Sequence, residues 1–496
     1  MTAGRLPATV AWSAIGLGLA FRLYVIALPT EALTARYLAD DYFYYLNVAF
    51  NIADGHGSSF DGGLTSTNGY QPLFLWLLAG VFALGATKTA VIHIGLMMQA
   101  IAAAGASAIA YRLLAARSLR WAGAMAAGLV SLNLFFVLPT VTGFEMALAL
   151  LGAMLALWCW QSGRSAFVVG IASGCAVLAR VDNLALVTAL GLVLLLQRRP
   201  RDLLGLLLGV AVVTAPWTLW NVMQFGHPLQ DSGVIKAHYR GLPAIWLSLS
   251  TAFSALPRIL LPGRIVDAMI DVAPWLVWSL ATVVLLVATR AAVKREHRTL
   301  ALYGAALLSA YVLVIDPNEP GALVRYLFPA WAVLAILVAQ MSSPFIVASV
   351  LLLHAADLAL YVRWERTAPL PVSYVGVAHA LAPAAIDKHV EPGMAVAAFD
   401  AGALGYFAPR PVVNLDGLAN HDIVELRRTC RQPYPQCLGH YLTEKGIQIL
   451  AGGTGFGWTN HFPDWPRWDR IYESPPLVDG SKLVILRIPR ETGARE

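Results

Sequence analysis

Charged residues are scarce in this sequence. Only 13% of its 496 residues are charged and 58% are hydrophobic, whereas soluble proteins carry about 25% charged residues. The apolar residues gather in runs close to the length that crosses a bilayer. The scarcity of charge argues against an ordinary soluble enzyme and favours a polytopic membrane protein.

The sequence also lacks the short motifs of several large protein classes. It has no P-loop, no dinucleotide-binding glycine fingerprint, no His/Cys spacing typical of zinc sites and no internal repeat. Its net charge of +6 does not indicate nucleic-acid binding, because Lys and Arg cluster between the apolar runs, where such residues set membrane topology. Nucleic acid is therefore not an expected partner.

The apolar runs predict about eleven membrane spans. The first run follows a short N-terminus carrying Arg5 and has no small-residue cleavage site behind it, which predicts a retained helix and not a signal peptide. Residues 73–86 are too few for a span and are predicted to lie at the interface. The predicted spans are residues 8–28, 92–111, 121–139, 146–160, 165–179, 184–197, 203–220, 273–289, 299–315, 327–340 and 344–361.

The positive-inside rule orients these spans. With residues 73–86 outside the bilayer, the arginine-rich loops that follow residues 111, 197 and 289 face the cytoplasm, as the rule requires. An odd number of spans from a cytoplasmic N-terminus then places the C-terminus outside. We therefore predict a multi-pass protein of the cytoplasmic (inner) membrane whose first outer loop is 29–72.

The composition changes after about residue 362. Residues 363–496 contain no spanning run, and short β-like runs alternate there with Gly-rich turns. They predict a small extracytoplasmic α/β domain behind a transmembrane domain in 1–362. Cys430 and Cys437 are predicted to be bonded, because a compartment outside the cytoplasm permits disulfides. The β-like runs are residues 394–398, 412–415, 447–451 and 482–488.

An acidic pair, Asp40 and Asp41, stands in the first outer loop. Residues 41–53 keep a helical rhythm with Tyr42 and Tyr45 on one side, which predicts a short helix along the interface. An exposed carboxylate near its normal pKa can take a proton from a hydroxyl group. A solvated helix start is the alternative interpretation. Adjacent carboxylates also repel, which raises one pKa or recruits a divalent cation.

The same topology brings further polar residues to the outer side. Ionisable groups at the ends of spans are costly unless they pair or serve a site. Structural alternatives exist for several of them: Glu145 as a helix cap, Arg180 and Asp182 as a simple ion pair, and His227 as a turn residue. The residues are Glu145, Arg180, Asp182, His227, Lys236, Arg325 and Tyr326.

These pieces together resemble a known family. The pattern Asp40-Asp41-x-x-Tyr44-Tyr45, followed by residues 51–57 and by Thr67-Asn68-Gly69-Tyr70-Gln71-Pro72-Leu73, is similar to the bacterial GT-C membrane glycosyltransferases, which use polyprenyl-phosphate sugars as donors. The tail resembles the soluble portion of some members of the arabinosyl- and mannosyltransferase type, including mycobacterial arabinosyltransferases. The remaining similar segments are residues 143–145, 178–182, 225–236, 325–329, 400–407 and 413–418.

The resemblance implies a GT-C-like fold and transfer of a monosaccharide to a hydroxyl of a cell-envelope glycan or glycolipid on the outer face. A loop-one aspartate is the general base in the family; Asp40 aligns best with it and Asp41 is its neighbour. Arg180, Arg325 and Lys236 are the candidates for binding the phosphate, since Arg suits bidentate contact and Lys offers a point charge. The implied substrate-binding residues are Tyr44, Asn68, Tyr70, Gln71, Glu145, Arg180, Asp182, His227, Lys236, Arg325 and Tyr326.

Several points stay open at this level. No motif demands a cofactor, but Asp40, Asp41 or Glu145 could hold a divalent cation such as Mg²⁺, Mn²⁺ or Ca²⁺. Transfer to a protein acceptor is one functional alternative. Another is a transporter or flippase of lipid-linked sugars, a class that often shows repeated halves with broken helices. The expected partners are the lipid bilayer, the polyprenyl-phosphate donor and the acceptor glycan or glycolipid.

Overall fold

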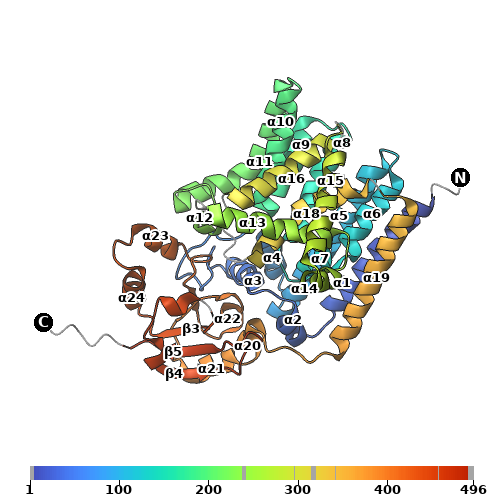
Figure 1. The fold of residues 1–496 in the computed structure, drawn as a ribbon. Coiled ribbons are helices and arrows are strands. Elements are labelled where there is room, and N and C mark those ends of the chain that lie inside the picture. Colours follow the sequence, from blue (N-terminus) through green and yellow to red (C-terminus); the bar gives the residue numbers. More distant parts are fainter. Residues whose placement is uncertain are drawn as a thin grey trace. The chain divides into compact units, whose positions relative to one another are not determined.

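The computed structural model describes residues 5–236, 242–294, 297–313, 320–340, 342–455 and 457–489. Most of this part of the chain is helical, and a five-stranded sheet forms near the C-terminus (Figure 1). The chain divides into two compact units. Met1–Ile26, Leu96–Leu219 and Lys236–Ala368 form what we call the helical unit, and Ala27–Gly95, Trp220–Ile235 and Pro369–Glu496 form the loop-tail unit.

Each apolar run that was predicted as a span is helical in its described residues. Within the part of the chain that the structure describes, five helices are long and apolar enough to cross a membrane, or six if the bent pair at residues 120–140 counts as one span. The other apolar helices are shorter, so the count of about eleven spans stays a prediction. The five long helices are α1 (Arg5–Ile26), α5 (Lys88–Ala115), α11 (Pro200–Phe225), α15 (Pro274–Ala292) and α19 (Pro344–Thr367).

The shorter apolar helices occupy the remaining predicted runs. The bent pair turns by 63° at Asn133, whose side chain accepts a hydrogen bond from the Phe135 backbone N–H and so caps the second helix. This cap explains why one predicted run is two helices. These elements are α6 (Arg120–Leu132), α7 (Leu134–Val137), η1 (Leu138–Thr140), α8 (Met146–Gln161), α9 (Ala166–Ala179), η2 (Val181–Asn183), α10 (Leu184–Leu196), α16 (Arg298–Leu313) and α18 (Phe328–Ala339).

The sequence prediction left the segment between α11 and α15 without structure, and the structure places helices there. Pro257 and Pro262 interrupt the apolar pattern in this segment, and proline starts a helix more readily than it continues one. The result is a series of short helices and not another span. They are α12 (Asp231–Lys236), α13 (Leu242–Ala255), η3 (Leu256–Ile259) and α14 (Gly263–Val272), and α17 (Pro320–Tyr326) precedes α18.

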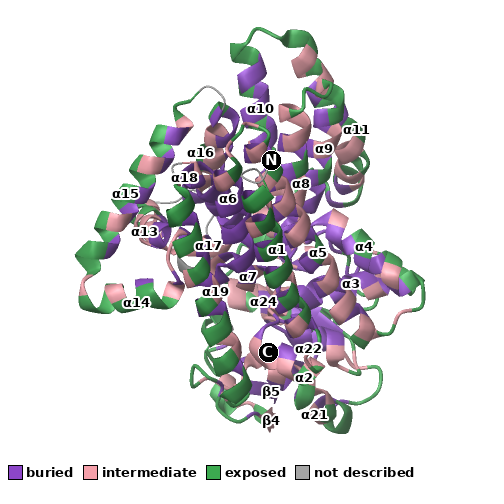
Figure 2. Cartoon of the chain, turned by 90° about the vertical axis from the view of Figure 1, so that its right-hand side faces the viewer, coloured by how far each residue is buried: buried purple, intermediate pink, exposed green. Residues whose placement is uncertain are grey.

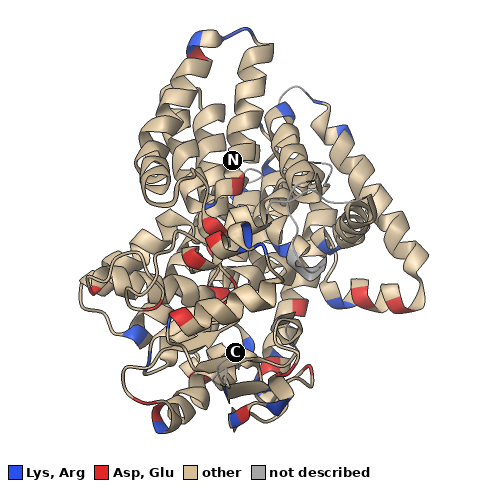
Figure 3. Ribbon diagram, turned by 90° about the vertical axis from the view of Figure 1, so that its left-hand side faces the viewer, with Lys and Arg blue, Asp and Glu red and all other residues tan. Residues whose placement is uncertain are grey.

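Burial differs sharply between helices of the helical unit. Nearly every residue of α6 is buried, because α1, α18 and α19 all pack on it. In contrast, α15 exposes most of its side chains although they are apolar (Figure 2). Figure 3 shows few Lys and Arg positions along the helical parts of the ribbon. An uncharged apolar surface of this kind is expected where a helix faces lipid.

Small residues allow two of the helices to approach closely. A side chain on Gly170 in α9 would place its Cβ 2.3 Å from the Leu206 carbonyl oxygen of α11. Gly209 in α11 would meet the Phe167 carbonyl oxygen at the same distance. Such glycine contacts are typical of helix pairs in membranes, where tight packing drives association.

The sheet lies in the loop-tail unit, with strand order β2-β1-β3-β5-β4. β1 pairs in parallel with both β2 and β3, while β5 is antiparallel to β3 and β4. All four predicted β-like runs are strands. The fifth strand, β4, was missed because its Asp, Arg and Glu residues mask the alternation. The strands are β1 (Val396–Ala398), β2 (Val412–Asn414), β3 (Ile449–Gly453), β4 (Asp469–Glu473) and β5 (Leu483–Arg487).

Helices complete the loop-tail unit, and the predicted disulfide between Cys430 and Cys437 is present. It joins the end of one helix to the body of the next. The helices of this unit are α2 (Thr30–Arg36), α3 (Asp40–Ala53), α4 (Pro72–Ala83), α20 (Tyr374–Ala380), α21 (Ala382–His389), α22 (Gly402–Phe407), α23 (His421–Thr429) and α24 (Tyr434–Glu444). Short 3₁₀ turns η5 (Gly457–Asn460) and η6 (Trp465–Arg467) precede β4.

The helix α3 confirms one prediction and corrects another. Residues 41–53 are helical, as their rhythm predicted. However, every residue from Tyr42 to Ala49 is buried, so α3 does not present one apolar face to an interface. The physical reason is that α4 and α22 both pack on it. The helix that carries the acidic pair is therefore an internal element of the loop-tail unit.

Candidate functional site

The first residue of the acidic pair is engaged by backbone donors. Asp40 opens α3, and its Oδ2 accepts a hydrogen bond from the Gly402 N–H at 2.9 Å while its Oδ1 accepts one from the Ala403 N–H at 2.7 Å. A Cβ on Gly402 would lie 2.1 Å from the Asp40 carbonyl oxygen. Only glycine therefore allows α22 to approach, and Asp40 docks α3 onto α22.

This environment changes the chemistry expected of Asp40. Burial raises its pKa to about 8, and this effect exceeds the opposing effect of the two backbone hydrogen bonds. The expectation of an exposed carboxylate with an ordinary pKa is therefore wrong for Asp40. Asp41, the second residue of the pair, is half-buried. Whether either residue is the catalytic base stays a prediction.

Tyr44, one turn further along α3, reaches the tail. Its hydroxyl accepts hydrogen bonds from the Ala401 N–H (2.8 Å) and the Asn414 amide (3.0 Å), and it donates to Asp416 Oδ2 at 3.3 Å. Asp416 Oδ2 also accepts from the Asp400 N–H at 2.7 Å. Burial raises the pKa of Asp416.

The position of these tail residues follows from the sheet. Asp400 comes two residues after β1 and Asp416 two residues after β2. Because β1 and β2 are parallel neighbours, their carboxyl ends meet at one edge, where α/β proteins commonly place functional groups. The sequence showed both segments only through the family resemblance and did not identify Asn414 or Asp416 as site residues. Aspartates that directly follow adjacent β-like runs were the available signal.

The segment that closes loop one is held by internal contacts. Asn68 is fully buried, and its side chain donates to the Leu229 carbonyl and accepts from the Asp231 N–H. The Tyr70 hydroxyl lies 2.7 Å from Ser58 Oγ. Gln71 is buried, and its backbone N–H donates to the Tyr45 hydroxyl. These predicted substrate-binding residues stabilise the loop in this structure, and contact of Asn68, Tyr70 and Gln71 with a substrate stays a prediction.

Loop one and the tail also meet at a glycine. A Cβ on Gly69 would lie 1.6 Å from the Leu418 carbonyl oxygen. The His421 N–H donates to the Ser66 carbonyl three residues earlier in loop one. Two segments that the sequence presents as separate motifs, residues 67–73 and 413–418, therefore form one contact surface inside the loop-tail unit.

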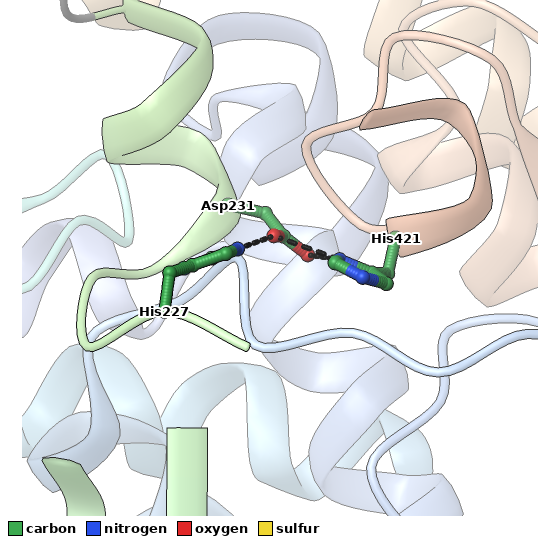
Figure 4. A group of neighbouring side chains, drawn as sticks. All are labelled: His227, Asp231 and His421. Carbon is green, nitrogen blue, oxygen red and sulfur yellow. Dashed lines mark hydrogen bonds and ion pairs between the residues drawn. The ribbon is translucent and has the colours of Figure 1, made fainter. Parts of the chain in front are cut away.

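His227 belongs to a small cluster beside this surface. Its Nδ1 lies 2.7 Å from the Leu229 carbonyl oxygen, which is the turn contact expected from the sequence. Its Nε2 faces Asp231, and His421 approaches the same carboxylate from the other side (Figure 4). The sequence gave no sign of His421, which is 190 residues from Asp231. Lys236 ends α12, and its side chain lies outside the described residues.

A second cluster lies in the helical unit, around Arg180. Its Nε donates to Asp182 Oδ2 at 2.7 Å, its NH1 to Glu145 Oε1 at 2.5 Å and its NH2 to the Tyr311 hydroxyl at 3.1 Å. Tyr311 in turn donates to Asp182. The side chains of Arg180, Glu145 and Asp182 are each less than a tenth exposed. The predicted ion pair of Arg180 and Asp182 is therefore confirmed, with Glu145 as a third member.

Glu145 has both a helix-end position and an ion-pair partner. Glu145 occupies the N-cap position of α8, but its side chain makes no capping hydrogen bond. The position expected of a helix cap is therefore confirmed, and stabilisation of the helix N-terminus by the Glu145 charge stays a prediction. Tyr311 was missed by the sequence, where it is one of many aromatic residues inside an apolar run.

Arg325 and Tyr326 extend this cluster through aromatic contacts. The Arg325 guanidinium lies over the Phe144 ring, 4.2 Å from its centre, and over the Tyr326 ring at 5.0 Å. Tyr326 stacks on Tyr311 with their ring planes 2° apart. A cation held over aromatic faces is stabilised by the ring quadrupoles. The predicted site residues thus fall into two groups, one in each unit.

Comparison with known proteins supports the fold. ArnT from Cupriavidus metallidurans in the apo state is similar at a TM-score of 0.57 and 15% identity, over 97% of this chain and 100% of that chain. The ArnT structure bound to undecaprenyl phosphate gives 0.53 and 16% identity, over 96% and 99%. The Archaeoglobus fulgidus oligosaccharyltransferase tethered with an acceptor peptide gives 0.48 and 13%, over 98% and 75%.

Comparison of the sequence alone gives fewer matches than comparison of the structure. A domain of unknown function, DUF8728, matches residues 373–478, about a fifth of the chain. No curated protein matches the sequence. The likeness to ArnT nevertheless extends over nearly the full length of both chains, and it shows that this chain shares the helical fold of ArnT.

Proposed function

We propose that this chain is a membrane glycosyltransferase that moves a monosaccharide from a polyprenyl-phosphate donor to a hydroxyl acceptor. One observation carries the proposal: the fold is shared over nearly the whole length of both chains with ArnT, one structure of which is bound to undecaprenyl phosphate. The acceptor is a cell-envelope glycan or glycolipid. The reaction takes place on the outer face of the cytoplasmic membrane, where the predicted topology puts the first loop.

The reaction requires a base and a stabilised leaving group. As the acceptor oxygen bonds to the anomeric carbon, the base takes the hydroxyl proton, the bond from that carbon to the phosphate oxygen breaks, and polyprenyl phosphate departs with the electron pair. A positioned carboxylate performs such proton transfer with an acceleration of about 10²–10⁴. The loop-one acidic pair is the proposed source of this base.

Between the two aspartates, the contacts favour Asp41. Both oxygens of Asp40 accept hydrogen bonds from the α22 backbone, and this docking accounts for the presence of Asp40. Its pKa of about 8 also leaves most of Asp40 protonated at neutral pH, which is the wrong form for a base. We therefore assign docking to Asp40 and proton transfer to Asp41.

The cations proposed for the donor phosphate are Arg325 and Lys236. Arg180 is less suited, because all three of its guanidinium nitrogens already contact Asp182, Glu145 or Tyr311. A phosphate-binding cation acts on both ground and transition states, so its loss weakens donor binding as well as turnover. A divalent cation (Mg²⁺, Mn²⁺ or Ca²⁺) bound at Asp41 or Glu145 would also neutralise charge on the donor phosphate.

The test uses the full-length protein in lipid nanodiscs with a panel of polyprenyl-phosphate pentoses and hexoses. The expected result is release of free polyprenyl phosphate together with sugar on a glycan or glycolipid acceptor. A peptide acceptor tests the protein-glycosyltransferase alternative. Movement of a fluorescent lipid-linked sugar across liposomes without sugar release would contradict the proposal and favour a flippase.

A further inference from the structure

His227, Asp231 and His421 form a cluster in the loop-tail unit that the proposed reaction does not use. We propose that this cluster binds a divalent transition-metal cation, with zinc as the best-suited ion. Each residue offers one ligand atom, and these atoms all lie within 4.8 Å of one another. Figure 4 shows the two imidazole rings on either side of the Asp231 carboxylate. Imidazole nitrogens select zinc and related metals over Mg²⁺ and Ca²⁺, which prefer oxygen ligands.

The distances match those of a small tetrahedral ion. Zinc bonds of about 2.0 Å in a tetrahedral site separate neighbouring ligand atoms by about 3.3 Å. His227 Nε2 lies 3.3 Å from Asp231 Oδ1, and His421 Nδ1 lies 3.1 Å from the same oxygen. Both histidine contacts to Asp231 therefore have the spacing that one ion requires, and the three ligand atoms together lie within 4.8 Å of one another.

The hydrogen bonding of His227 orients it as a ligand. Its Nδ1 lies 2.7 Å from the Leu229 carbonyl oxygen, which only accepts, so Nδ1 carries the proton. In the neutral ring, Nε2 then has a lone pair that faces the Asp231 carboxylate. This Nε2 is buried and makes no hydrogen bond among the described residues. A backbone carbonyl on the far nitrogen is the usual companion of a metal-bound histidine.

The buried charge of Asp231 is a separate argument for a bound cation. The Asp231 side chain is fully buried, and an ionised carboxylate without a nearby cation is costly in such a place. A divalent cation between Asp231 and two neutral imidazoles supplies that charge at the carboxylate itself. Protonation of His227 is the competing solution, because an imidazolium would donate to Asp231 instead. The metal content of the protein distinguishes a bound cation from a protonated His227.

A rigid outer layer holds the ligands in place. Asn68 Oδ1 accepts from the Asp231 N–H at 2.8 Å, and the Asn68 amide donates to the Asn221 side chain and the Leu229 carbonyl. Asn221 donates to the Pro228 carbonyl. Both asparagines are fully buried. The loop that carries His227 is therefore fixed before any ion binds, which reduces the entropy lost on binding.

The site joins segments that are distant in the sequence. His227 lies in the turn between α11 and α12, Asp231 is the first residue of α12, and His421 is the first residue of α23. An ion bound by all three cross-links this turn to the tail. Because metal binds the folded arrangement and not the unfolded chain, zinc should raise the melting temperature, by about 5 °C when it is well above its dissociation constant.

The experiment measures metal in full-length protein purified without a metal-affinity tag, incubated with Zn²⁺ and desalted. We expect about one zinc per chain, and X-ray absorption should show a first shell of nitrogen and oxygen with imidazole scattering. His227→Ala and His421→Ala should each lower the zinc content at least about tenfold, as loss of one of three ligands does. Chelation should reverse the rise in melting temperature.

A matched control is available in loop one. His56 and Asp54 form a His-Asp pair of similar separation, 3.2 Å, but both side chains are about half exposed and the pair is not part of the metal cluster. His56→Ala should keep full zinc content. Unmodified protein that retains no zinc and melts at the same temperature with and without zinc would overturn the site in favour of a protonated His227. Full zinc content in His421→Ala would overturn it as well.

Discussion

The two units bury charge in opposite ways. In the helical unit, the Arg180 guanidinium is surrounded by Glu145, Asp182 and Tyr311, so positive and negative groups compensate one another. In the loop-tail unit, the carboxylates of Asp40 and Asp416 accept hydrogen bonds from backbone N–H, amide and phenol groups, which are neutral donors.

This difference in partners changes the pKa values of the carboxylates. A buried pair of opposite charges keeps both members ionised and fixes their geometry. Neutral donors compensate a buried carboxylate only partly, so the pKa values of Asp40 and Asp416 rise. Groups with strongly shifted pKa values are typical of sites that exchange protons. The Arg180 cluster is therefore a structural ion-pair cluster, whereas proton transfer by Asp41 in the loop-tail unit stays a proposal.

The largest effect is expected from removing the cation of the helical unit. Arg180→Ala leaves Glu145 and Asp182 buried without their cation, and loss of one partner of a buried ion pair costs about 3–5 kcal/mol. The measurement is the free energy of unfolding in detergent micelles. Arg199→Ala, which removes an exposed ion pair with Asp202, is the control and should cost less than about 1 kcal/mol. Equal losses in the two variants would show that the cluster is not a structural core.

A smaller effect is expected where α22 meets α3. Gly402→Ala inserts a Cβ that would lie 2.1 Å from the Asp40 carbonyl oxygen, so the two helices must separate. Overpacking of this kind costs about 1–3 kcal/mol. Gly439→Ala in α24 is the control, because a Cβ there meets nothing within 4 Å. If the Gly402 variant is as stable as the control, Asp40 does not depend on close docking against α22.

The smallest effect, measured per pH unit, is a slope of the unfolding free energy with pH. Since burial raises the pKa of Asp40 from its ordinary value near 4 to about 8, the folded state keeps a proton that the unfolded chain releases in this range. Stability is therefore greatest below about pH 4 and falls as pH rises to about 8, by at most about 1.4 kcal/mol per pH unit. Asp40→Asn should flatten the unfolding free energy between pH 5 and 8. Identical slopes in the parent and the variant would contradict a raised pKa.

Much of the secondary structure could be predicted from the sequence, because it depends on local periodicity. The apolar runs are helices, four β-like runs are strands, and residues 41–53 form the helix α3. The disulfide between Cys430 and Cys437 followed from a short separation in a shared segment. The strand β4 and the helices α13 and α14 were missed, since polar residues or prolines disguise their patterns.

The site could be predicted only in part, because its geometry depends on distant contacts. Asp40 and Gly402 are 362 residues apart, and His421 lies 190 residues from Asp231. No local pattern reports such contacts. The amphipathic interpretation of α3 was wrong for the same reason: the sequence does not show that a tail helix covers its second face. The ion pair of Arg180 and Asp182 was predictable, because only Val181 separates them.

The proposed roles of the acidic pair, docking for Asp40 and proton transfer for Asp41, give the most direct test of the account. The measurement is single-turnover sugar transfer and donor affinity for the unmodified protein and three asparagine variants, at Asp41, Asp40 and Asp54. Asp54 is an exposed carboxylate after the end of α3 and is the matched control. The experiment is run with and without chelator, so that a bound cation can be recognised.

We expect Asp41→Asn to lower the transfer rate by about 100-fold or more while donor binding survives, because the change removes the proton acceptor and keeps the size of the side chain. Asp40→Asn should lose stability but retain more activity than Asp41→Asn, and Asp54→Asn should transfer sugar at the parent rate. Parent rates in both Asp40→Asn and Asp41→Asn would contradict the account, because the acidic pair would then not be the catalytic centre.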